Sequence, residues 1–358
     1  MTKRKVSIRD VAKKVGYSTT VVSHAMNGYA RINPQTRRQI QAVARQMGYR
    51  PNVFARSLAT RRSGLIGMVV PGIITSFYPE TILPLKTCLE GAGYGLLLMT
   101  SDDAKQAERR AIEFLRRRQI DGLIVAPARD VKDASLYDEM AAEGTPVVML
   151  DRWIASARCH SVATDNSAGA EQATRHLIEL GHRRIGLVKL RSTCSTTQER
   201  TAGYRKALSA AGVAFDAGLV QSPPYNIGRD CYVDGEEALR SLLGLDRPPT
   251  ALFVLHDVLA VGMLGAAARF GLGVPAELSI VGYDDLEVVK HLPVPLTTVA
   301  QDKESLGRTA AELILRSLAD AKAAKQDVRL PPALVVREST AQPAARSNRP
   351  CKLLNDRG

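Results

Sequence analysis

Eight apolar runs between residues 65 and 285 constrain the fold of this chain more than any other feature. Each is almost continuously apolar, which is typical of strands buried on both faces rather than on one. The runs are LIGMVVPG (65 to 72), YGLLLMT (94 to 100), DGLIVAPA (121 to 128), PVVMLDR (146 to 152), SVATDN (161 to 166), RRIGLVKL (183 to 190), TALFVLH (250 to 256) and SIVGYDD (279 to 285). Helical patterns separate them, for example at 104 to 118, 168 to 180, 199 to 211 and 258 to 270. This alternation predicts a doubly wound α/β fold with parallel sheets.

The runs form two series of four, which predicts two subdomains. In doubly wound folds the carboxyl ends of the strands gather the binding groups, so a ligand would bind between the two subdomains at those ends.

The charge of the chain is concentrated at its amino-terminal end. The net charge is +13, and residues 1 to 62 hold 14 basic residues against a single acidic one, Asp10. Basic and acidic residues balance in the rest of the chain. A basic segment attached to a neutral body predicts a polyanion as the partner of that segment alone. A mitochondrial presequence is also basic and poor in acids, and is the alternative.

Helix-capping signals argue against a presequence. Ser7 and Asp10 read as a capping box ahead of one short amphipathic helix. Ser18 stands at the N-cap of a second helix, and Asn33, followed by Pro34, at that of a third. Three short helices that bury one shared face predict a small domain. No apolar run is long enough for a signal peptide or a membrane span.

Two helices joined by a tight turn in a very basic domain predict a helix-turn-helix that recognises DNA. Thr19, Thr20 and His24 share the exposed face of the second helix, where they can reach base edges and thymine methyl groups. The Ser18 hydroxyl and the backbone N–H groups at that helix start suit a phosphate. A solvated face that contacts another protein is the alternative.

The stretches SIRDVAKKVGYSTTVVSHAMNG and RINPQTRRQIQAVARQMGYRPNVFARSLATRRSGLIG, within residues 7 to 67, resemble the amino terminus of the lactose/purine repressor (LacI/GalR) family. The resemblance continues to about residue 340. It implies that residues 19 to 27 are the recognition helix and that the chain is a dimeric regulator of transcription, most simply a repressor. The DNA-binding residues expected from the pattern and the resemblance are Ser7, Ser18, Thr19, Thr20, Ser23, His24, Asn27, Arg56 and Leu58.

The resemblance also implies a hinge helix within residues 51 to 62. A helix of about eight residues is too short to be stable alone, so it would form only against its twin from a second subunit on operator DNA. Leu58 would then insert into the minor groove and bend the duplex. On the residues alone, Leu58 could equally pack on its own domain.

The expected domains are therefore a helix-turn-helix domain at 1 to 50, the hinge and linker at 51 to 62, and an effector-binding and dimerisation domain at 63 to 340. Within the last, we expect one subdomain of about 63 to 160 with a returning segment near 293 to 320. The other would hold about 161 to 292 with 321 to 340. The polar tail from 341 to 358 is expected to be disordered.

Polar side chains at the strand ends are the candidate effector ligands. By resemblance the effector-contacting residues are Phe77, Tyr78, Asp165, Arg200, Asp257 and Asp284, of which Asp257 could instead cap a helix. Carboxylates accept hydrogen bonds from sugar hydroxyls, Arg donates a planar fork, and an aromatic ring covers an apolar sugar face. Each Asp could instead merely N-cap the helix after its strand. The purine-binding branch has a second Arg where Cys194 lies, so we expect a sugar or sugar derivative rather than a purine.

Motifs for catalysis or metal binding are missing from the sequence. We find no G-x-G-x-x-G after a strand, no phosphate-binding loop, no H-E-x-x-H and no G-x-S-x-G. The six histidines are scattered, and the five cysteines are odd in number and form no C-x-x-C. The cysteines indicate reduced thiols of a cytoplasmic protein rather than a disulfide or metal framework. We therefore expect no enzyme, cofactor or metal, with an enzyme or a stand-alone solute-binding protein on this fold as the alternatives.

Overall fold

The computed structural model describes residues 6–26, 32–49, 62–223, 231–320 and 322–344. The chain forms two compact units, Met1–Ser63 and Gly64–Gly358. Nearly all of the predicted hinge helix lies outside the described residues, as do most of the predicted tail and the expected DNA contacts Asn27, Arg56 and Leu58.

The first unit contains the three predicted helices, α1 (Ile8–Val15), α2 (Thr19–Met26) and α3 (Pro34–Gln46). Their shared core consists of Val11, Ala12, Val22, Ala25, Ile40 and Ala44. All six side chains are buried, so helices that are individually short are stabilised by packing on one another.

The predicted caps are confirmed. The Ser7 hydroxyl accepts from the Asp10 backbone N–H (3.3 Å), and the Asp10 carboxylate accepts from the Ser7 backbone N–H (2.9 Å). The Ser18 hydroxyl accepts from the Val21 N–H at 3.3 Å, and Asn33 caps α3. These side chains supply acceptors for N–H groups that have no partner within the helix.

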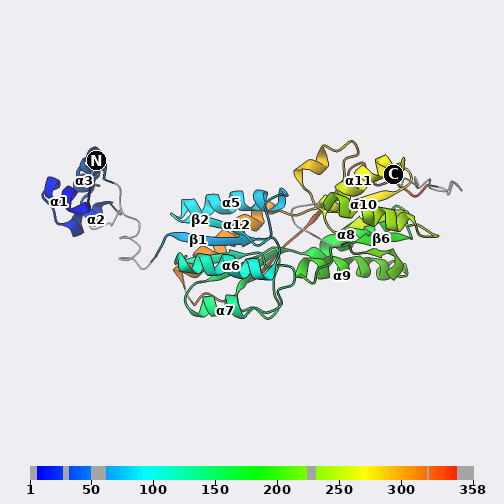
Figure 1. Cartoon of the computed structure of the whole chain (residues 1–358), viewed down its shortest axis with the longest axis horizontal. Coiled ribbons are helices and arrows are strands. Elements are labelled where there is room, and N and C mark those ends of the chain that lie inside the picture. The colour runs from blue at the N-terminus through cyan, green and yellow to red at the C-terminus, as the bar shows by residue number, and fades with distance from the viewer. Residues whose placement is uncertain (1–5, 27–31, 50–61, 224–230, 321, 345–358) are drawn as a thin grey trace. The chain divides into compact units, whose positions relative to one another are not determined.

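The second unit contains two six-stranded sheets. The first sheet is entirely parallel and has the order β11-β5-β4-β3-β1-β2. Its strands are β1 (Leu65–Val70), β2 (Gly95–Thr100), β3 (Gly122–Val125), β4 (Val147–Leu150), β5 (His160–Thr164) and β11 (Asp327–Leu330). Helices α5 (Phe77–Gly91) and α12 (Lys303–Ala319) cover one face, and α6 (Lys105–Arg117) and α7 (Ser135–Ala142) cover the other (Figure 1).

The second sheet has the order β12-β10-β9-β8-β6-β7, and only β12 runs antiparallel to its neighbour. Its strands are β6 (Ile185–Val188), β7 (Val220–Gln221), β8 (Ala251–Val254), β9 (Ser279–Asp284), β10 (Thr297–Ala300) and β12 (Ala333–Val335). Helices α8 (Asn166–Glu179) and α9 (Ser195–Ala210) pack on one face, and α10 (Cys231–Leu243) and α11 (Asp257–Arg269) on the other. The short 3-10 turns η1 (Ala217–Leu219) and η2 (Glu287–Lys290) complete the described elements.

The predicted fold class is confirmed, and each of the eight predicted strands is present within a few residues of its expected bounds. The core strands β1, β3, β4 and β8 are buried along almost their whole length, which is why they read as continuous apolar runs. Within the described parts of the chain, no helix has both the length and the apolar character that crossing a bilayer requires.

The predicted division between the subdomains is wrong in three places. Strand β5, expected in the second subdomain, pairs with β4 in the first sheet. Strand β10, expected to return to the first subdomain, pairs with β9 in the second sheet, so only α12 of that segment returns. The segment 321 to 340 is divided, because β11 joins the first sheet and β12 the second. An apolar strand carries no mark of which sheet it joins, so the sequence could not place these segments.

The chain therefore passes between the subdomains three times, at Asp165, at 301 to 302 and at 331 to 332.

Candidate functional site

The polar face of α2 is placed as the sequence predicts. Ser18, Thr19 and Thr20 are exposed, while Ser23 and His24 are half-buried. The opposite face of α2 is in the core. The hydroxyl groups at the start of α2 are therefore accessible to a ligand, next to a helix N-terminus whose dipole favours phosphate.

Ser7 has a different setting from the other expected DNA contacts. It is half-buried, and its hydroxyl donates to the Asp10 carboxylate at 2.7 Å within the capping box. The Ser7 hydroxyl already takes part in the capping box, so a contact with phosphate would compete with these hydrogen bonds.

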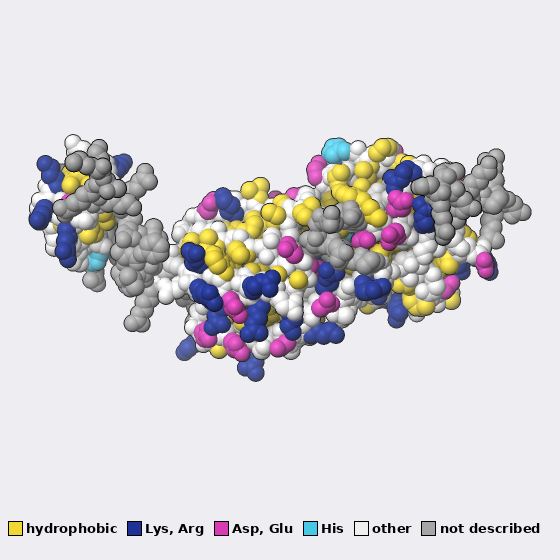
Figure 2. Space-filling model, viewed as in Figure 1, with side chains coloured by type: hydrophobic (Ala, Val, Ile, Leu, Met, Phe, Trp, Pro, Cys, Tyr) yellow, Lys and Arg dark blue, Asp and Glu magenta, His cyan; other side chains and the backbone are white. Residues whose placement is uncertain are grey.

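The first unit carries exposed basic side chains. Arg9, Lys13, Lys14, Arg38 and Arg45 are all exposed, and Figure 2 shows Lys and Arg spread over the face of this unit that is in view. Exposed cations on a small domain produce a positive field that attracts the phosphate backbone of nucleic acid.

A cavity of about 480 Å³ lies in the second unit, at the carboxyl ends of strands from both sheets. The loop after β1 and the residues after β4 contribute the wall from the first subdomain. The wall from the second comes from α9, the start of α10, the end of β8 and the end of β9. This is the position that doubly wound folds use to bind ligands.

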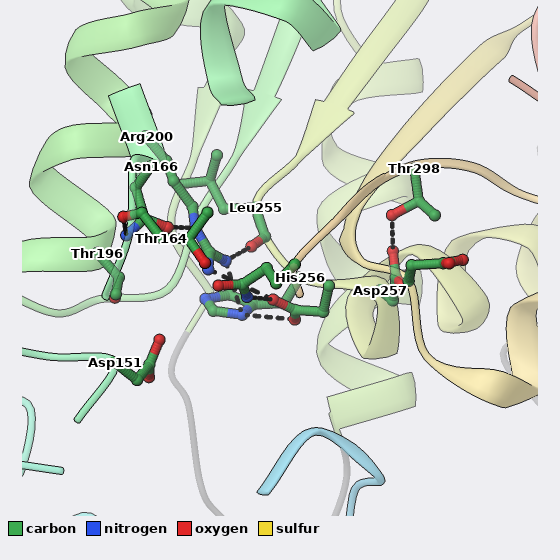
Figure 3. Close-up of polar contacts among 12 residues, drawn as sticks. Asp151, Thr164, Asn166, Thr196, Arg200, Leu255, His256, Asp257 and Thr298 are labelled. Carbon is green, nitrogen blue, oxygen red and sulfur yellow. Dashed lines mark hydrogen bonds and ion pairs between the residues drawn. The ribbon is translucent and has the colours of Figure 1, made fainter. Parts of the chain in front are cut away.

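Arg200, on α9, has a contact at each of its three guanidinium nitrogens. It is 1 % exposed. Its Nε donates to the Asn166 side chain (2.8 Å) and its Nη1 to the Leu255 carbonyl (2.5 Å), as Figure 3 shows. Its Nη2 lies 3.3 Å from the Asp284 carboxylate, and the guanidinium covers the Tyr283 ring at 3.6 Å from its centroid. These contacts fix the guanidinium in a single orientation.

Asp284 ends β9 with a φ of 118°, in the left-handed region that glycine favours. Such strain persists where surrounding contacts hold the residue. Here Gln301 Nε2 donates to the carboxylate at 2.7 Å, and His256 Nδ1 lies at 3.4 Å. Burial alone would raise the pKa of Asp284, but Arg200 and these hydrogen bonds hold it below its usual value. Burial lowers the pKa of His256, so this imidazole is neutral near pH 7.

The opposite wall also carries a strand-end carboxylate. Asp151 follows β4 with a φ of 67°, and the Tyr78 hydroxyl donates to it at 2.9 Å. Burial raises the pKa of Asp151, against the lowering effect of Arg152 and Arg200. The Phe77 ring meets Tyr78 edge to face, with centroids 5.1 Å apart, and both line the cavity.

The structure brings four of the six predicted effector residues together: Phe77, Tyr78, Arg200 and Asp284 line the cavity. Asp165 does not, because it is exposed and accepts from the Ala168 N–H at 2.9 Å as the cap of α8. For Asp165 the alternative given in the sequence analysis, a helix cap rather than an effector ligand, therefore fits the structure.

Asp257 is also placed outside the cavity lining. It is fully buried and accepts from the Thr298 hydroxyl (2.6 Å) and the Leu286 N–H (2.9 Å). Figure 3 shows the Asp257–Thr298 pair set apart from the Arg200 cluster. Burial, with a smaller contribution from Asp284, holds its pKa well above the usual value. Asp257 therefore connects α11 to β10 and to the loop after β9 by hydrogen bonds.

Sequence reasoning missed several lining residues, among them Asp151, Arg152, His256 and Gln301. A signal was present for three of them, since Asp151 and Arg152 close the run PVVMLDR and His256 closes TALFVLH. Gln301 carried no such signal, because β10, the strand that it follows, was not predicted.

The pKa of Asp284 gives a testable acid dependence. A carboxyl with a lowered native pKa stabilises the fold above its unfolded pKa, near 3.9, and loses that contribution as the pH falls through its native value. We expect the free energy of unfolding of Asp284→Asn to fall less steeply than that of the wild type below about pH 4. Urea unfolding between pH 7 and 3 measures this. Asp165→Asn is the control for the loss of one carboxylate, because it keeps a capping side chain at an exposed site. Identical dependence of the free energy of unfolding on pH in wild type and Asp284→Asn would contradict the expectation.

Comparison with known proteins assigns the family. Residues 7–52 match the model "Bacterial regulatory proteins, lacI family", and residues 174–340 match "Periplasmic binding protein-like domain". The HTH-type transcriptional regulator DegA of Bacillus subtilis is 33% identical over 338 residues, which cover 94% of this chain and 98% of DegA. The chain belongs to the lacI family. Another relative of this lacI-family chain is the transcriptional repressor CytR of Escherichia coli, 32% identical over 309 residues that cover 86% of this chain and 89% of CytR.

Solved structures of lacI-family regulators have the same fold. The lac repressor dimer bound to operator and the anti-inducer ONPF is similar with a TM-score of 0.82 at 26% identity, covering 94% of this chain and all of that one. The complex of the regulator CelR with cellobiose gives 0.70 at 28% identity, with the same coverage. This lacI-family chain is thus a DNA-binding transcriptional regulator of the repressor type. The relatives support neither the enzyme nor the stand-alone solute-binding alternative.

Proposed function

We propose that the chain is a homodimeric repressor whose affinity for a near-palindromic operator is controlled by a sugar or sugar derivative bound in the cavity. The observation that carries the proposal is one cavity walled by side chains of both subdomains, with strand-end carboxylates on each wall. A ligand there would contact both subdomains and favour one arrangement of them, so effector affinity and operator affinity would be linked reciprocally.

The relatives include both sugar-linked regulators and repressors named PurR, so the preference for a sugar over a purine rests on the side chains of this chain. A lacI-family regulator of Enterococcus faecium was solved with bound ribose, and CelR with cellobiose, while repressors named PurR are also among the relatives. In this chain Cys194 stands at the N-cap of α9 rather than in the cavity lining. The carboxylates of Asp151 and Asp284 suit hydroxyl groups, and Phe77 and Tyr78 suit the apolar face of a sugar ring.

Two residues near the second crossover connect the cavity with the rest of the effector domain. Gln301 donates to Asp284 at the cavity floor. The Lys303 ammonium, 9 % exposed, donates to Glu80 of α5 (2.7 Å) and to the Asp285 carbonyl (2.7 Å). Lys303 therefore ties helices of the first subdomain to the loop after β9 of the second, where a ligand would act.

Exposed apolar side chains support self-association of the second unit. Leu83 on α5 is 66 % exposed and Leu98 on the edge strand β2 is 37 % exposed. An edge strand with unpaired backbone groups and apolar side chains is normally covered, and a second subunit would cover both. We place the protein in the bacterial cytoplasm, on the nucleoid when it is bound to its operator.

For the first unit we propose the domain boundaries expected from the sequence, a helix-turn-helix domain at 1 to 50 and a hinge and linker at 51 to 62. We also propose that Thr19, Thr20 and His24 contact the bases of the operator. His24→Ala should lose about 1–3 kcal/mol of binding free energy on the preferred operator and relax base preference at one position in each half-site. Fluorescence anisotropy with a set of single-base operator variants measures both effects. Lys14→Ala, exposed on α1, is the control, because it removes a cation without removing a base-reading group. An unchanged base preference in His24→Ala would exclude the role.

A further inference from the structure

Trp153 is the only tryptophan of the chain, and it connects the two subdomains. It follows β4 of the first subdomain, where its ring packs on the core with the Arg329 guanidinium 4.9 Å from its centroid. Its backbone N–H donates to the Ser195 hydroxyl at 3.0 Å, and its indole N–H donates to the Glu199 carboxylate at 3.1 Å. Ser195 and Glu199 both belong to α9 of the second subdomain. One residue of the first subdomain therefore makes two hydrogen bonds to the second.

Glu199 extends this connection toward the cavity. Its second carboxylate oxygen accepts from the Asn166 amide at 3.2 Å. The amide nitrogen faces the carboxylate, because an ionised carboxylate can only accept. The amide oxygen is then left to accept from Arg200 Nε at 2.8 Å, as Figure 3 shows. Asn166 is 1 % exposed and directly follows the crossover at Asp165. A continuous chain of hydrogen bonds thus runs from Trp153 through Glu199 and Asn166 to Arg200.

The carboxylate of Glu199 is half-buried and depends on both of its donors. Burial raises the pKa of Glu199, against the lowering effect of the hydrogen bonds from Asn166 and Trp153 and of the charges of Arg329 and Arg200. A charged group removed from water is stable only where other donors replace the water. Hydrogen bonds within such a network strengthen one another. A change at Asn166 therefore alters the contact between Glu199 and Trp153, and the reverse.

Trp153 also has space to leave this contact. A second cavity, of about 160 Å³, borders it, and the residues that line this cavity, among them Met149, Ile154 and Ser161, belong to the first subdomain. Protein interiors are normally close-packed, so a void beside an aromatic ring allows the ring a second position. The indole ring has one position bonded to α9 and space for another within its own subdomain.

We propose that Trp153 and Glu199 form a latch between the subdomains, which transmits ligand contact at Arg200 to the arrangement of the two subdomains. The inference rests on the proposed function, because it assumes an effector in the cavity. Neither latch residue lines that cavity. Glu199 is a positioning residue that acts on Arg200 through Asn166. A ligand that bonds to Arg200 changes its contact with Asn166, and hence the strength with which Glu199 holds the indole of Trp153.

Fluorescence of the single tryptophan tests the contact in the full-length protein without any ligand. In Glu199→Ala the indole loses its acceptor, so the fraction of fast local motion in time-resolved anisotropy should rise roughly twofold or more. Glu199→Gln keeps one acceptor oxygen in place of two and should be intermediate. Glu171→Ala is the matched control, since it removes a carboxylate that joins α8 to Lys206 of α9 at 2.8 Å. Equal indole motion in wild type and Glu199→Ala would overturn the contact.

A second experiment tests the coupling. Trp153→Phe keeps an aromatic ring and the backbone N–H and removes only the indole donor. Ribose and cellobiose are the probes, and the sugar that changes the operator affinity of the wild type is the responding sugar. In Trp153→Phe the factor by which this sugar changes operator affinity should fall by roughly three- to tenfold. Melting temperature without sugar reports the fold, and Glu171→Ala should keep the wild-type factor. A merely structural role would lower the melting temperature and leave the factor unchanged.

Combining the substitutions shows whether the two residues act as one latch. Glu199→Ala should reduce the factor as Trp153→Phe does, and the double variant should reduce it no further, because both changes remove the same contact. Additive losses, or an unchanged factor in folded Trp153→Phe, would overturn the latch and leave the effector function standing. No response of the wild type to either sugar would overturn the sugar-effector function and the coupling together.

Discussion

Replacing Arg200 by alanine should abolish the effector response and lower the free energy of unfolding by about 3–5 kcal/mol. The change leaves the Asp284 carboxylate buried without its nearest cation and removes the hydrogen bonds to Asn166 and Leu255. It also leaves a void over the Tyr283 ring. Urea unfolding measures the stability, and operator binding with and without the responding sugar measures the regulation.

Two further variants distinguish the loss of the buried Arg200 contacts from the loss of any Arg side chain and from the loss of charge alone. Arg240→Ala removes an Arg whose side chain is 50 % exposed and paired with Glu236 on the same helix, so its loss should cost no more than about 1 kcal/mol. Arg200→Lys keeps the charge but loses the planar fork, and should fall between wild type and Arg200→Ala. A loss in Arg200→Ala as small as that in Arg240→Ala would show that the buried contacts are not stabilising.

A chain that begins at Gly64 should lose operator binding by roughly a thousandfold or more while it keeps effector binding. The excess of positive charge is confined to residues 1 to 62, and the remainder has no net charge. The remainder also forms its own compact unit with its own core. Anisotropy with labelled operator and calorimetry with the responding sugar measure the two activities separately.

Salt provides the companion measurement on the full-length protein. If Lys and Arg displace condensed counterions from DNA, the logarithm of operator affinity falls linearly with the logarithm of salt concentration. The chain beginning at Gly64 has no net positive charge to contribute, so any residual binding should respond weakly. Operator binding by the shortened chain at physiological salt would refute the assignment of DNA affinity to the first unit.

The sequence was sufficient for those parts of the fold that depend on local pattern. The capping box at Ser7 and the start of α3 at Asn33 depend on neighbouring residues alone, and both were predicted. The buried strands were found because burial on both faces makes them apolar throughout. Four strands were missed. Strands β7, β11 and β12 have only two to four residues and are half-buried or exposed. Strand β10 is mostly buried, but it has only four residues and two of them are threonine, so it forms no apolar run.

The site was only partly predictable for a different reason. A strand end indicates where a side chain starts but not which way it turns. Asp165 and Asp284 both follow buried strands, yet one turns back to cap a helix and the other faces the cavity. The partners that decide this, such as Gln301 for Asp284, are distant in sequence. Family resemblance selected Arg200 correctly as a lining residue, and the geometry supplied its role.

The three crossovers also determine when the two sheets can be completed during synthesis on the ribosome. Strand β11 covers the open side of β5, and β12 covers that of β10. Both final strands are translated after residue 326 of 358. Until they emerge, the nascent chain exposes two unfinished sheet edges at once, and such edges can pair with other chains. Neither sheet can be completed before β11 is translated, so a premature stop anywhere before β11 would leave both halves of the effector domain open to aggregation and proteolysis.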